Sequence, residues 1–365
     1  PRAAYGPGMD SCGKTLATVI KDEPYTLRNG KVLRNANGRY GGDTTIRKAI
    51  TWSNNVCAVK LSDEITQQLG FEYCEKFGIS TLVKSKTTEA GVFSDLDNQT
   101  LALGGLTDGV YNYEICAAYA TIANGGIYNS PTLYTKILDH DGNVLLEGTG
   151  ETRTVIKDST AALLTSAMQD VVNVGTGSRA QLPNMPVAGK TGTTSDNKDI
   201  WFCAYTPYYT CSVWAGYDTN KPLSNTSFHL DIWRKIMNRI HADLPYKDFE
   251  LSGSIEKKTI CTQSGKLAVS GCPAVTEYFA SGTIPTDACS GHRSSWSNDD
   301  PDDDSNNGSH GNNGGNTTPN SPQQPSDPSS PTPDPPADPN PPVEPDPPVD
   351  PNPPANPDQP TTPEG

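Results

Sequence analysis

The sequence has no run of about 18 apolar residues, the length that a membrane-spanning helix needs, and it does not start with a signal peptide. It has only five histidines, and none of its nine cysteines forms a Cys-x-x-Cys pair. We therefore expect no structural metal and no cofactor. It also lacks an excess of basic residues. The formal net charge of −14 argues against a nucleic-acid binder, because phosphate contacts need clustered Lys and Arg.

The negative charge lies almost wholly at the carboxyl end. Residues 294–365 hold 13 Asp and Glu and no Lys or Arg, whereas the residues before them hold 29 acidic and 28 basic side chains. Most of the 32 prolines also fall there, in repeats such as Asp346-Pro347-Pro348. Such a composition excludes helix and sheet and favours extended polyproline II. We expect a disordered acidic Pro-rich tail that acts as a spacer; the alternative is a ligand for a proline-reading partner.

Residues 1–245 have the pattern of one mixed body of helices and strands. Apolar residues recur at helical intervals in three segments, and apolar strands flank two turns. The expected helices span 45–68, 112–124 and 158–172, and the expected hairpins join 134–138 to 144–146 and 200–205 to 210–216. We expect Asp158, with Ser159 and Thr160, to cap the third helix. Helices grouped between hairpins predict an α+β fold, in which helices pack on an antiparallel sheet.

A small cysteine-containing segment is expected from residue 246 to 293. It holds one candidate strand at 255–260, followed by three cysteines among Gly and Pro, namely Cys261, Cys272 and Cys289. The segment is too short for a large core, so a disulfide between two of these cysteines would be a useful staple. Cys203 and Cys211 could form a cross-strand pair, or each could be buried as a small hydrophobe.

The most specific local signal is the tripeptide Lys190-Thr191-Gly192. An edge strand carrying Lys190 would point an ammonium into a cleft, and Gly192 would let a substrate backbone lie close to the strand. The hydroxyls of Thr191 and Thr193 could hold a carboxylate. Upstream, Ser53-Asn54-Asn55 gives a Ser-x-Asn tripeptide at a helix end. Taken alone, the first tripeptide could be a polar strand end and the second a helix cap.

Together the two motifs resemble those of class A penicillin-binding proteins, the bifunctional cell-wall synthases. Further stretches similar to this family follow in the family's order over residues 1–292, at 101–107, 118–126, 199–218 and 261–273. The resemblance implies the transpeptidase fold shared with serine β-lactamases, and a D,D-transpeptidase with an acyl-serine mechanism. Its implied partners are D-Ala-D-Ala stem peptides, an acceptor amine and inhibitory β-lactams. Its implied location is the outer face of the bacterial cytoplasmic membrane.

The same resemblance implies roles for individual residues. Ser53 would relay a proton to the leaving amine, and Asn55 would hold the substrate amide. Lys190 would supply positive charge, and the backbone N–H of Thr193 would provide half of an oxyanion hole. Thr191 and Gly192 complete the expected substrate-binding set. Trp201 and Tyr217 are candidates for the walls of the groove, with burial in the core as the alternative.

The chain departs from the family at the Ser-x-x-Lys motif that carries the nucleophile. Ser11-Cys12-Gly13-Lys14 matches the spacing, but Gly13 weakens a helix and residues 15–22 have an extended pattern. In the family the lysine is followed by proline and by a segment like residues 4–9. On that interpretation Pro1 follows the catalytic lysine, and the nucleophile precedes this chain.

We therefore expect an inactive piece of a transpeptidase whose parent also has a glycosyltransferase domain and an N-terminal membrane anchor, both missing here. The alternatives are a D,D-carboxypeptidase or β-lactamase-like hydrolase, and a non-catalytic module that binds the cell wall.

Overall fold

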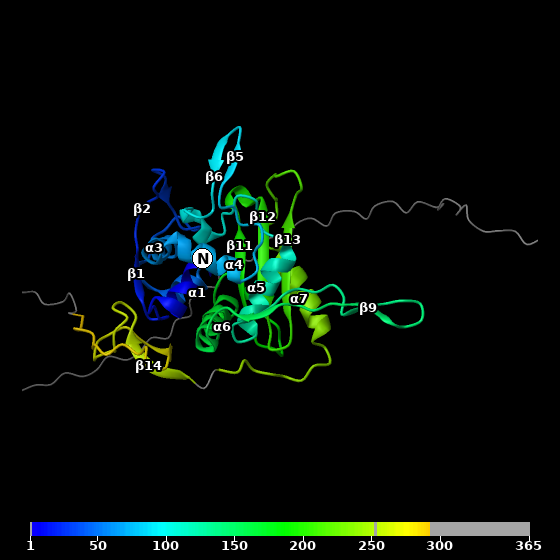
Figure 1. Cartoon of the computed structure of the whole chain (residues 1–365). Coiled ribbons are helices and arrows are strands. Elements are labelled where there is room, and N and C mark those ends of the chain that lie inside the picture. The colour runs from blue at the N-terminus through cyan, green and yellow to red at the C-terminus, as the bar shows by residue number, and fades with distance from the viewer. Residues whose placement is uncertain (1, 252–253, 293–365) are drawn as a thin grey trace, which may run out of the picture. The chain divides into compact units, whose positions relative to one another are not determined.

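The largest sheet has three antiparallel strands, in the order β11 (Ala188–Thr193), β12 (Asp199–Tyr205) and β13 (Thr210–Gly216). They belong to a computed structural model that describes residues 2–251 and 254–292 (Figure 1). The expected tail lies outside the described residues. The predicted strands at 200–205 and 210–216 are confirmed, and β11 is an edge strand of this sheet, as the Lys-Thr-Gly motif predicted.

Helices cover both faces of this sheet. Side chains alternate between the two faces along each strand, so each face presents apolar side chains for helices to pack against. On one face Ala188, Cys203 and Tyr205 join the main core, which also contains residues of α5 (Asn112–Ala123) and α6 (Asp158–Asn173). On the other face Phe202 and Ala204 pack against side chains of α7 (Phe228–Ile240), among them Trp233 and Met237. The helix–sheet–helix arrangement confirms the predicted α+β fold.

The helices expected at 112–124 and 158–172 are confirmed as α5 and α6, but the expected cap of α6 is wrong. The N-cap of α6 is Lys157, whose side chain makes no capping bond. Asp10, in α1 (Arg2–Ser11), serves instead: its carboxylate accepts from the Lys157 backbone N–H at 2.8 Å and from the Thr160 hydroxyl at 3.0 Å. A carboxylate from another helix thus satisfies the amino end of α6.

The prediction of a single helix at 45–68 is wrong, because this segment forms separate helices. Helix α2 (Ile46–Thr51) and helix α3 (Asn55–Ile65) are separated by three residues, of which Ser53 has a positive φ of 54°. Asn54 caps α3 by accepting from the backbone N–H of Cys57 at 2.8 Å. A third helix, α4 (Gln67–Lys76), follows at once.

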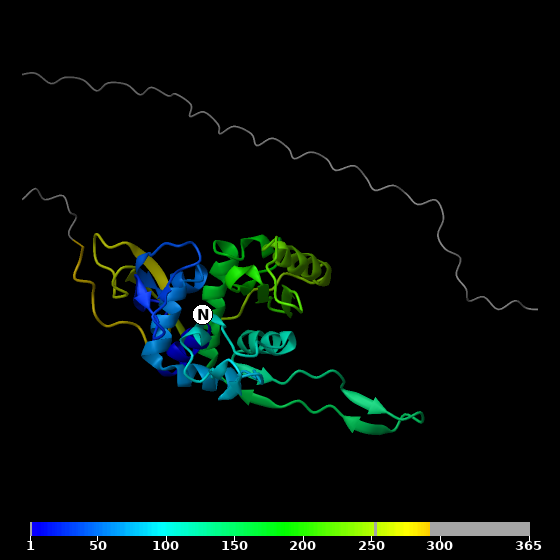
Figure 2. The same cartoon turned by 90° about the horizontal axis from the view of Figure 1, so that it is seen from above.

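The remaining strands form two-stranded antiparallel pairs around this body. They are β1 (Val19–Asp22) with β4 (Gly42–Thr45), β2 (Tyr25–Thr26) with β3 (Val32–Leu33), β5 (Lys86–Thr88) with β6 (Gly91–Phe93), β7 (Ile127–Asn129) with β10 (Thr152–Thr154), and β8 (Lys136–Leu138) with β9 (Val144–Glu147). Short 3₁₀ turns are η1 (Gln99–Leu103), η2 (Ser178–Ala180) and η3 (Ser195–Asn197). The β8–β9 pair is the predicted hairpin, and it projects from the body (Figure 2). None of the helices in the described part of the chain could cross a membrane.

The last hairpin, β14 (Ile255–Cys261) with β15 (Ala274–Ala280), is joined to the body by a buried ion cluster. The Arg47 guanidinium of α2 lies 2.7 Å from Asp170 of α6 and 2.7 Å from Glu277 of β15, which is almost fully buried. Burial alone would lower the pKa of Arg47, but hydrogen bonds to Glu277 and Asp170 raise it above its usual value. The cluster therefore stays charged and ties β15 to α2 and α6.

Replacing Arg47 by Ala should destabilise the protein strongly. The change leaves Glu277 buried without its partner, and breaking a buried pair in this way costs about 3–5 kcal/mol. Urea unfolding followed by circular dichroism measures the loss. Lys136→Ala is the control, because Lys136 is more than half exposed and pairs with the exposed Glu147, so little change is expected. Equal losses in the two variants would contradict the importance of the buried cluster.

Candidate active site

Lys190 is the third residue of β11 and is buried, with 2% of its surface exposed. The β11–β12 register places it opposite Cys203, on the face of the sheet that meets the main core. Its Nζ donates to the carbonyl oxygen of Thr191 at 3.1 Å. The predicted lysine is thus an interior cation at the edge of the sheet.

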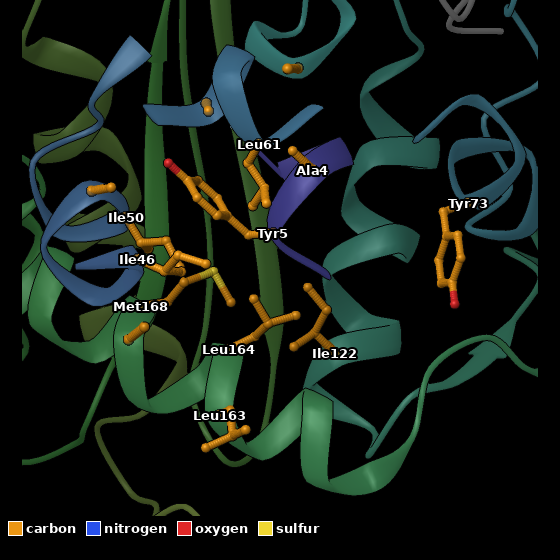
Figure 3. Close-up of a cluster of buried hydrophobic side chains, with 14 of the residues drawn as sticks. Ala4, Tyr5, Ile46, Ile50, Leu61, Tyr73, Ile122, Leu163, Leu164 and Met168 are labelled. Atoms are coloured by element: carbon orange, nitrogen blue, oxygen red, sulfur yellow. The ribbon is translucent and has the colours of Figure 1, made fainter. Parts of the chain in front are cut away.

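Lys190 borders a partly open apolar cavity of about 100 Å³ that is lined largely by helices of the core. Its lining includes Tyr5 of α1, Phe77 of α4, Ile122 of α5 and Leu164 of α6. Figure 3 shows side chains of this core, with the Tyr5 ring among Ile50, Leu61 and Met168. Because apolar walls screen charge poorly, the field of the ammonium is stronger here than in water.

The hydroxyl of Tyr5 is buried in the same core and finds no hydrogen-bond partner among the described residues. Burial, followed by the nearby Cys57 and Asp22, raises the pKa of Tyr5 well above its usual value. The ring therefore stays neutral and serves the core as an apolar wall.

The other residues of the Lys-Thr-Gly motif become more exposed toward the end of β11. The Thr191 hydroxyl lies 2.7 Å from the Thr176 hydroxyl. A Cβ added at Gly192 would come within 3.3 Å of the Cβ of Trp201, so this glycine also makes room for the neighbouring strand. Thr193 is exposed, and its hydroxyl forms no hydrogen bond with any described residue. The strand end is therefore open to a ligand at Thr193.

The Ser-x-Asn motif lies in the break between α2 and α3. Ser53 is half-buried and has a left-handed backbone conformation that residues other than Gly, Asn and Asp rarely adopt. Its hydroxyl has no hydrogen-bond partner in the described part of the chain. The Asn55 side chain donates to the carbonyl oxygen of Arg34 at 3.0 Å. Of the two predicted side chains, Ser53 is the one that has no hydrogen-bond partner among residues 2–251 and 254–292.

Two residues that the sequence analysis did not select hold this break in place. The buried Asp22 accepts from the side-chain amide of Asn54 at 2.6 Å and from that of Asn35 at 2.9 Å. Asn35 in turn accepts from the backbone N–H of Asn55 at 3.0 Å. No short motif marks this pair, because its two residues lie in separate segments of the chain.

One short segment touches both motifs. Gly175 packs so closely on α2 that an added Cβ would lie 2.4 Å from the carbonyl oxygen of Thr51, two residues before Ser53. The next residue, Thr176, is the partner of Thr191. Residues 175 and 176 therefore connect the end of α2 with the Lys-Thr-Gly strand, a role that the sequence analysis missed.

Trp201 and Tyr217, the candidate aromatic walls of the substrate groove, have different surroundings. Trp201 is half-buried, with its ring 6.1 Å from that of Trp214. Tyr217 is 44% exposed, and Lys221 lies 4.1 Å from its ring centre. The lining of the cavity beside Lys190 contains neither Trp201 nor Tyr217.

The suggested disulfide between Cys203 and Cys211 is wrong for the described structure. Cys203 pairs in register with Ser212, and Cys211 pairs with Ala204. The two cysteines are one register step apart, so their side chains point to opposite faces of the sheet. All nine cysteines are thiols, including the three in the C-terminal segment where a disulfide was considered.

Ser11 and Lys14, the residues with Ser-x-x-Lys spacing, do not pair with each other. Ser11 ends α1, and its hydroxyl lies 2.5 Å from the Tyr73 hydroxyl. Lys14 lies outside the helix and forms an ion pair with Glu64. A nucleophile needs a base within hydrogen-bond reach, and this arrangement provides none for Ser11.

Two family profiles cover most of the described chain. Residues 4–240 match the profile described as the penicillin binding protein transpeptidase domain. Residues 252–294 match that of the penicillin-binding protein 1A C-terminal domain.

Curated relatives agree with these profiles. The chain is 34% identical over 305 residues to penicillin-binding protein 1A of Clostridium botulinum strain Langeland, covering 79% of this chain and 36% of that protein. It is 31% identical over 313 residues to penicillin-binding protein 1A/1B of Bacillus subtilis, covering 78% of this chain and 33% of that protein. The chain thus spans about a third of the length of the curated relatives it matches.

Solved structures share the fold. Penicillin-binding protein 1A from Haemophilus influenzae superposes with a TM-score of 0.66 at 22% identity, covering 79% of this chain and 48% of that one. PonA1 from Mycobacterium tuberculosis, solved in complex with penicillin V, superposes with a TM-score of 0.60 at 25% identity, covering 68% and 69%.

Replacing Gly175 by Ala should disturb the site and lower stability. The new Cβ would clash with the backbone of Thr51, which cannot yield as a flexible side-chain end would, so α2 must shift away from α6. We expect a loss of about 1–3 kcal/mol in the free energy of unfolding, measured in urea. Gly6→Ala is the control, because its Cβ would meet only Leu164 at an ordinary 3.8 Å. A Gly175→Ala protein as stable as Gly6→Ala would contradict this close packing.

Proposed function

The chain belongs to the penicillin-binding protein transpeptidase family, and from that premise we propose that the whole protein is a D,D-transpeptidase of peptidoglycan synthesis. In the proposed reaction a serine attacks the penultimate D-Ala carbonyl of a stem peptide, and the terminal D-Ala leaves. An amine of a neighbouring strand then takes the acyl group from the serine. The observation that carries this proposal is the connection of the buried Lys190 strand with the Ser53 loop through Gly175 and Thr176.

The proposed roles follow from the surroundings of each side chain. The Ser53 hydroxyl has no hydrogen-bond partner among the described residues, so it can accept and pass a proton to the leaving amine. Asn55 holds the substrate amide. Lys190 provides fixed positive charge beside apolar walls, which favours a nearby anion.

The substrate-binding strand end completes the proposed site. The exposed end of β11 would receive the substrate, with the backbone N–H of Thr193 as an oxyanion donor and the hydroxyls of Thr191 and Thr193 near the terminal carboxylate. Gly192 keeps the strand free of a side chain between them.

We assign the nucleophile to a serine outside the residues described here. Ser11 and Lys14 are engaged with Tyr73 and Glu64, respectively, and do not face each other as nucleophile and base.

We also propose the division into a transpeptidase domain at 1–245, a C-terminal segment at 246–293 and a tail at 294–365. β-Lactams are the proposed inhibitors, in line with the penicillin V complex of the similar PonA1. We propose the outer face of the cytoplasmic membrane as the location.

Labelling with a fluorescent penicillin tests the function. A chain extended upstream through the family's Ser-x-x-Lys motif should form a stable acyl-enzyme, and Lys190→Ala should slow acylation about 10²–10³-fold, as the loss of an electrostatic stabiliser does. Lys198→Ala is the matched control, because Lys198 is partly exposed and pairs with the exposed Asp196. Thermal unfolding of each variant separates loss of chemistry from loss of fold.

Two outcomes would overturn the proposal. If the extended chain folds but never labels, a non-catalytic wall-binding module is the better interpretation. If a D-Ala-D-Ala stem peptide is released as a free acid even in the presence of an acceptor amine, the protein is a hydrolase.

Deleting residues 294–365 should leave the acylation rate of the extended chain unchanged. No step of the proposed reaction uses this acidic segment, whose charge has the same sign as the substrate carboxylate. The acylation rate is measured by quenching the penicillin-labelling reaction at several times. A large loss of acylation would give the segment a role in catalysis.

A further inference from the structure

Four side chains with metal-binding atoms converge in the C-terminal segment: Cys261, Cys272, Cys289 and His292. All four candidate ligand atoms lie within 4.8 Å of one another. The imidazole Nε2 is 3.0 Å from the sulfur of Cys261 and 3.5 Å from that of Cys289. In a tetrahedral zinc site, bonds of about 2.3 Å to sulfur and about 2.0 Å to nitrogen place the ligand atoms roughly 3.5–3.8 Å apart. The cluster is thus already close to that size.

Main-chain bonds hold two of the four ligands, Cys261 and Cys289, independently of the side chains. Leu267 forms β-bridges to Ile260 on one side and to Ala288 on the other, so it joins the neighbours of Cys261 and Cys289. The backbone N–H of Cys289 donates to the Leu267 carbonyl at 2.8 Å, and that of Cys261 donates to the Lys266 carbonyl at 2.8 Å. Thiols held by such a frame lose little conformational freedom when they bind an ion.

The turns that carry the four ligands have only a small core of their own. The local core consists of Ala17, Ile260 and Phe279, with Ile284 packed against them. So small a core rarely stabilises a segment alone, and small units of this kind are stabilised by disulfides or by a structural metal. A disulfide would use only two of the three sulfurs and would leave the third thiol and the imidazole without a role.

We propose that Cys261, Cys272, Cys289 and His292 bind one structural Zn²⁺. On binding, each of the three thiols releases its proton to solvent, and His292 coordinates as a neutral imidazole through Nε2. The four ligands close the tetrahedral shell and leave no open position, as in structural rather than catalytic zinc sites. Soft thiolates select Zn²⁺ over Mg²⁺ and Ca²⁺, which prefer oxygen ligands. The site does not depend on the proposed transpeptidase function.

The expectation of no metal rested on the absent Cys-x-x-Cys pair, and it overlooked a related signal. Cys289 and His292 have Cys-x-x-His spacing, which places a thiol and an imidazole on one short turn. The other two ligands are 17 and 28 residues upstream of Cys289, so only the β14–β15 hairpin and the bridges of Leu267 bring them near.

Metal analysis of the full 365-residue chain tests the proposal. Protein purified under reducing conditions without chelator should contain about one zinc per chain by mass spectrometry, and refolding with Co²⁺ should give the intense absorption of thiolate-bound tetrahedral cobalt. Cys289→Ser and His292→Ala should each bind zinc at least about tenfold more weakly in competition with a chromogenic chelator. His292 is exposed, so its replacement should leave the fold intact.

Matched controls use residues outside the cluster. Cys12→Ser removes an exposed thiol, and His140→Ala removes an exposed imidazole, so both should retain zinc. Stripping the metal should lower the thermal midpoint of the wild type by more than that of His292→Ala. Three results would overturn the proposal: protein without zinc whose peptide map shows a disulfide among the three cysteines, stoichiometric iron in place of zinc, or equal zinc affinity in His292→Ala and His140→Ala.

Discussion

The antiparallel pairing of β11 with β12 is the interaction on which the candidate site depends. Its register places Lys190 opposite Cys203 and therefore on the face that meets the main core. A slip by one residue would turn Lys190 toward α7 and bring Thr191 into the cavity, because strand side chains alternate between faces. Among the strands of the described residues, β11 pairs with β12 alone, so its other edge carries no strand from that part of the chain. The same pairing thus determines both the buried charge and the open edge.

Elements with strong local signals could be predicted from the sequence. Helices α5 and α6 have sustained apolar periodicity, and the β8–β9 and β12–β13 hairpins have apolar strands on either side of a turn. Helix α7 was missed although its signal was present, since Leu230, Trp233 and Met237 recur at helical spacing on one face. The predicted Lys190 strand was also correct, because the motif itself implies an edge strand.

Other features depend on contacts between distant segments and have no local signal. Ser53 interrupts an otherwise helical pattern because Asn54 caps the next helix and Asp22, more than thirty residues upstream in the sequence, holds that cap. Gly175 could have been assigned to any turn, and only its packing on Thr51 explains why a side chain is excluded there. These contacts position the predicted motif residues, so the sequence indicates the chemistry of the site better than its geometry.

The buried Arg47 cluster makes two parts of the chain interdependent. The family profiles divide the chain between residues 240 and 252, yet the guanidinium is shared by α2 and α6 on one side of that division and by β15 on the other. Detaching the C-terminal hairpin would remove Glu277 from the guanidinium and leave Arg47 with Asp170 as its remaining partner, at a cost of roughly 3–5 kcal/mol. The body and the hairpin thus share one buried charge cluster, and the boundary between the two profiles separates residues that form it.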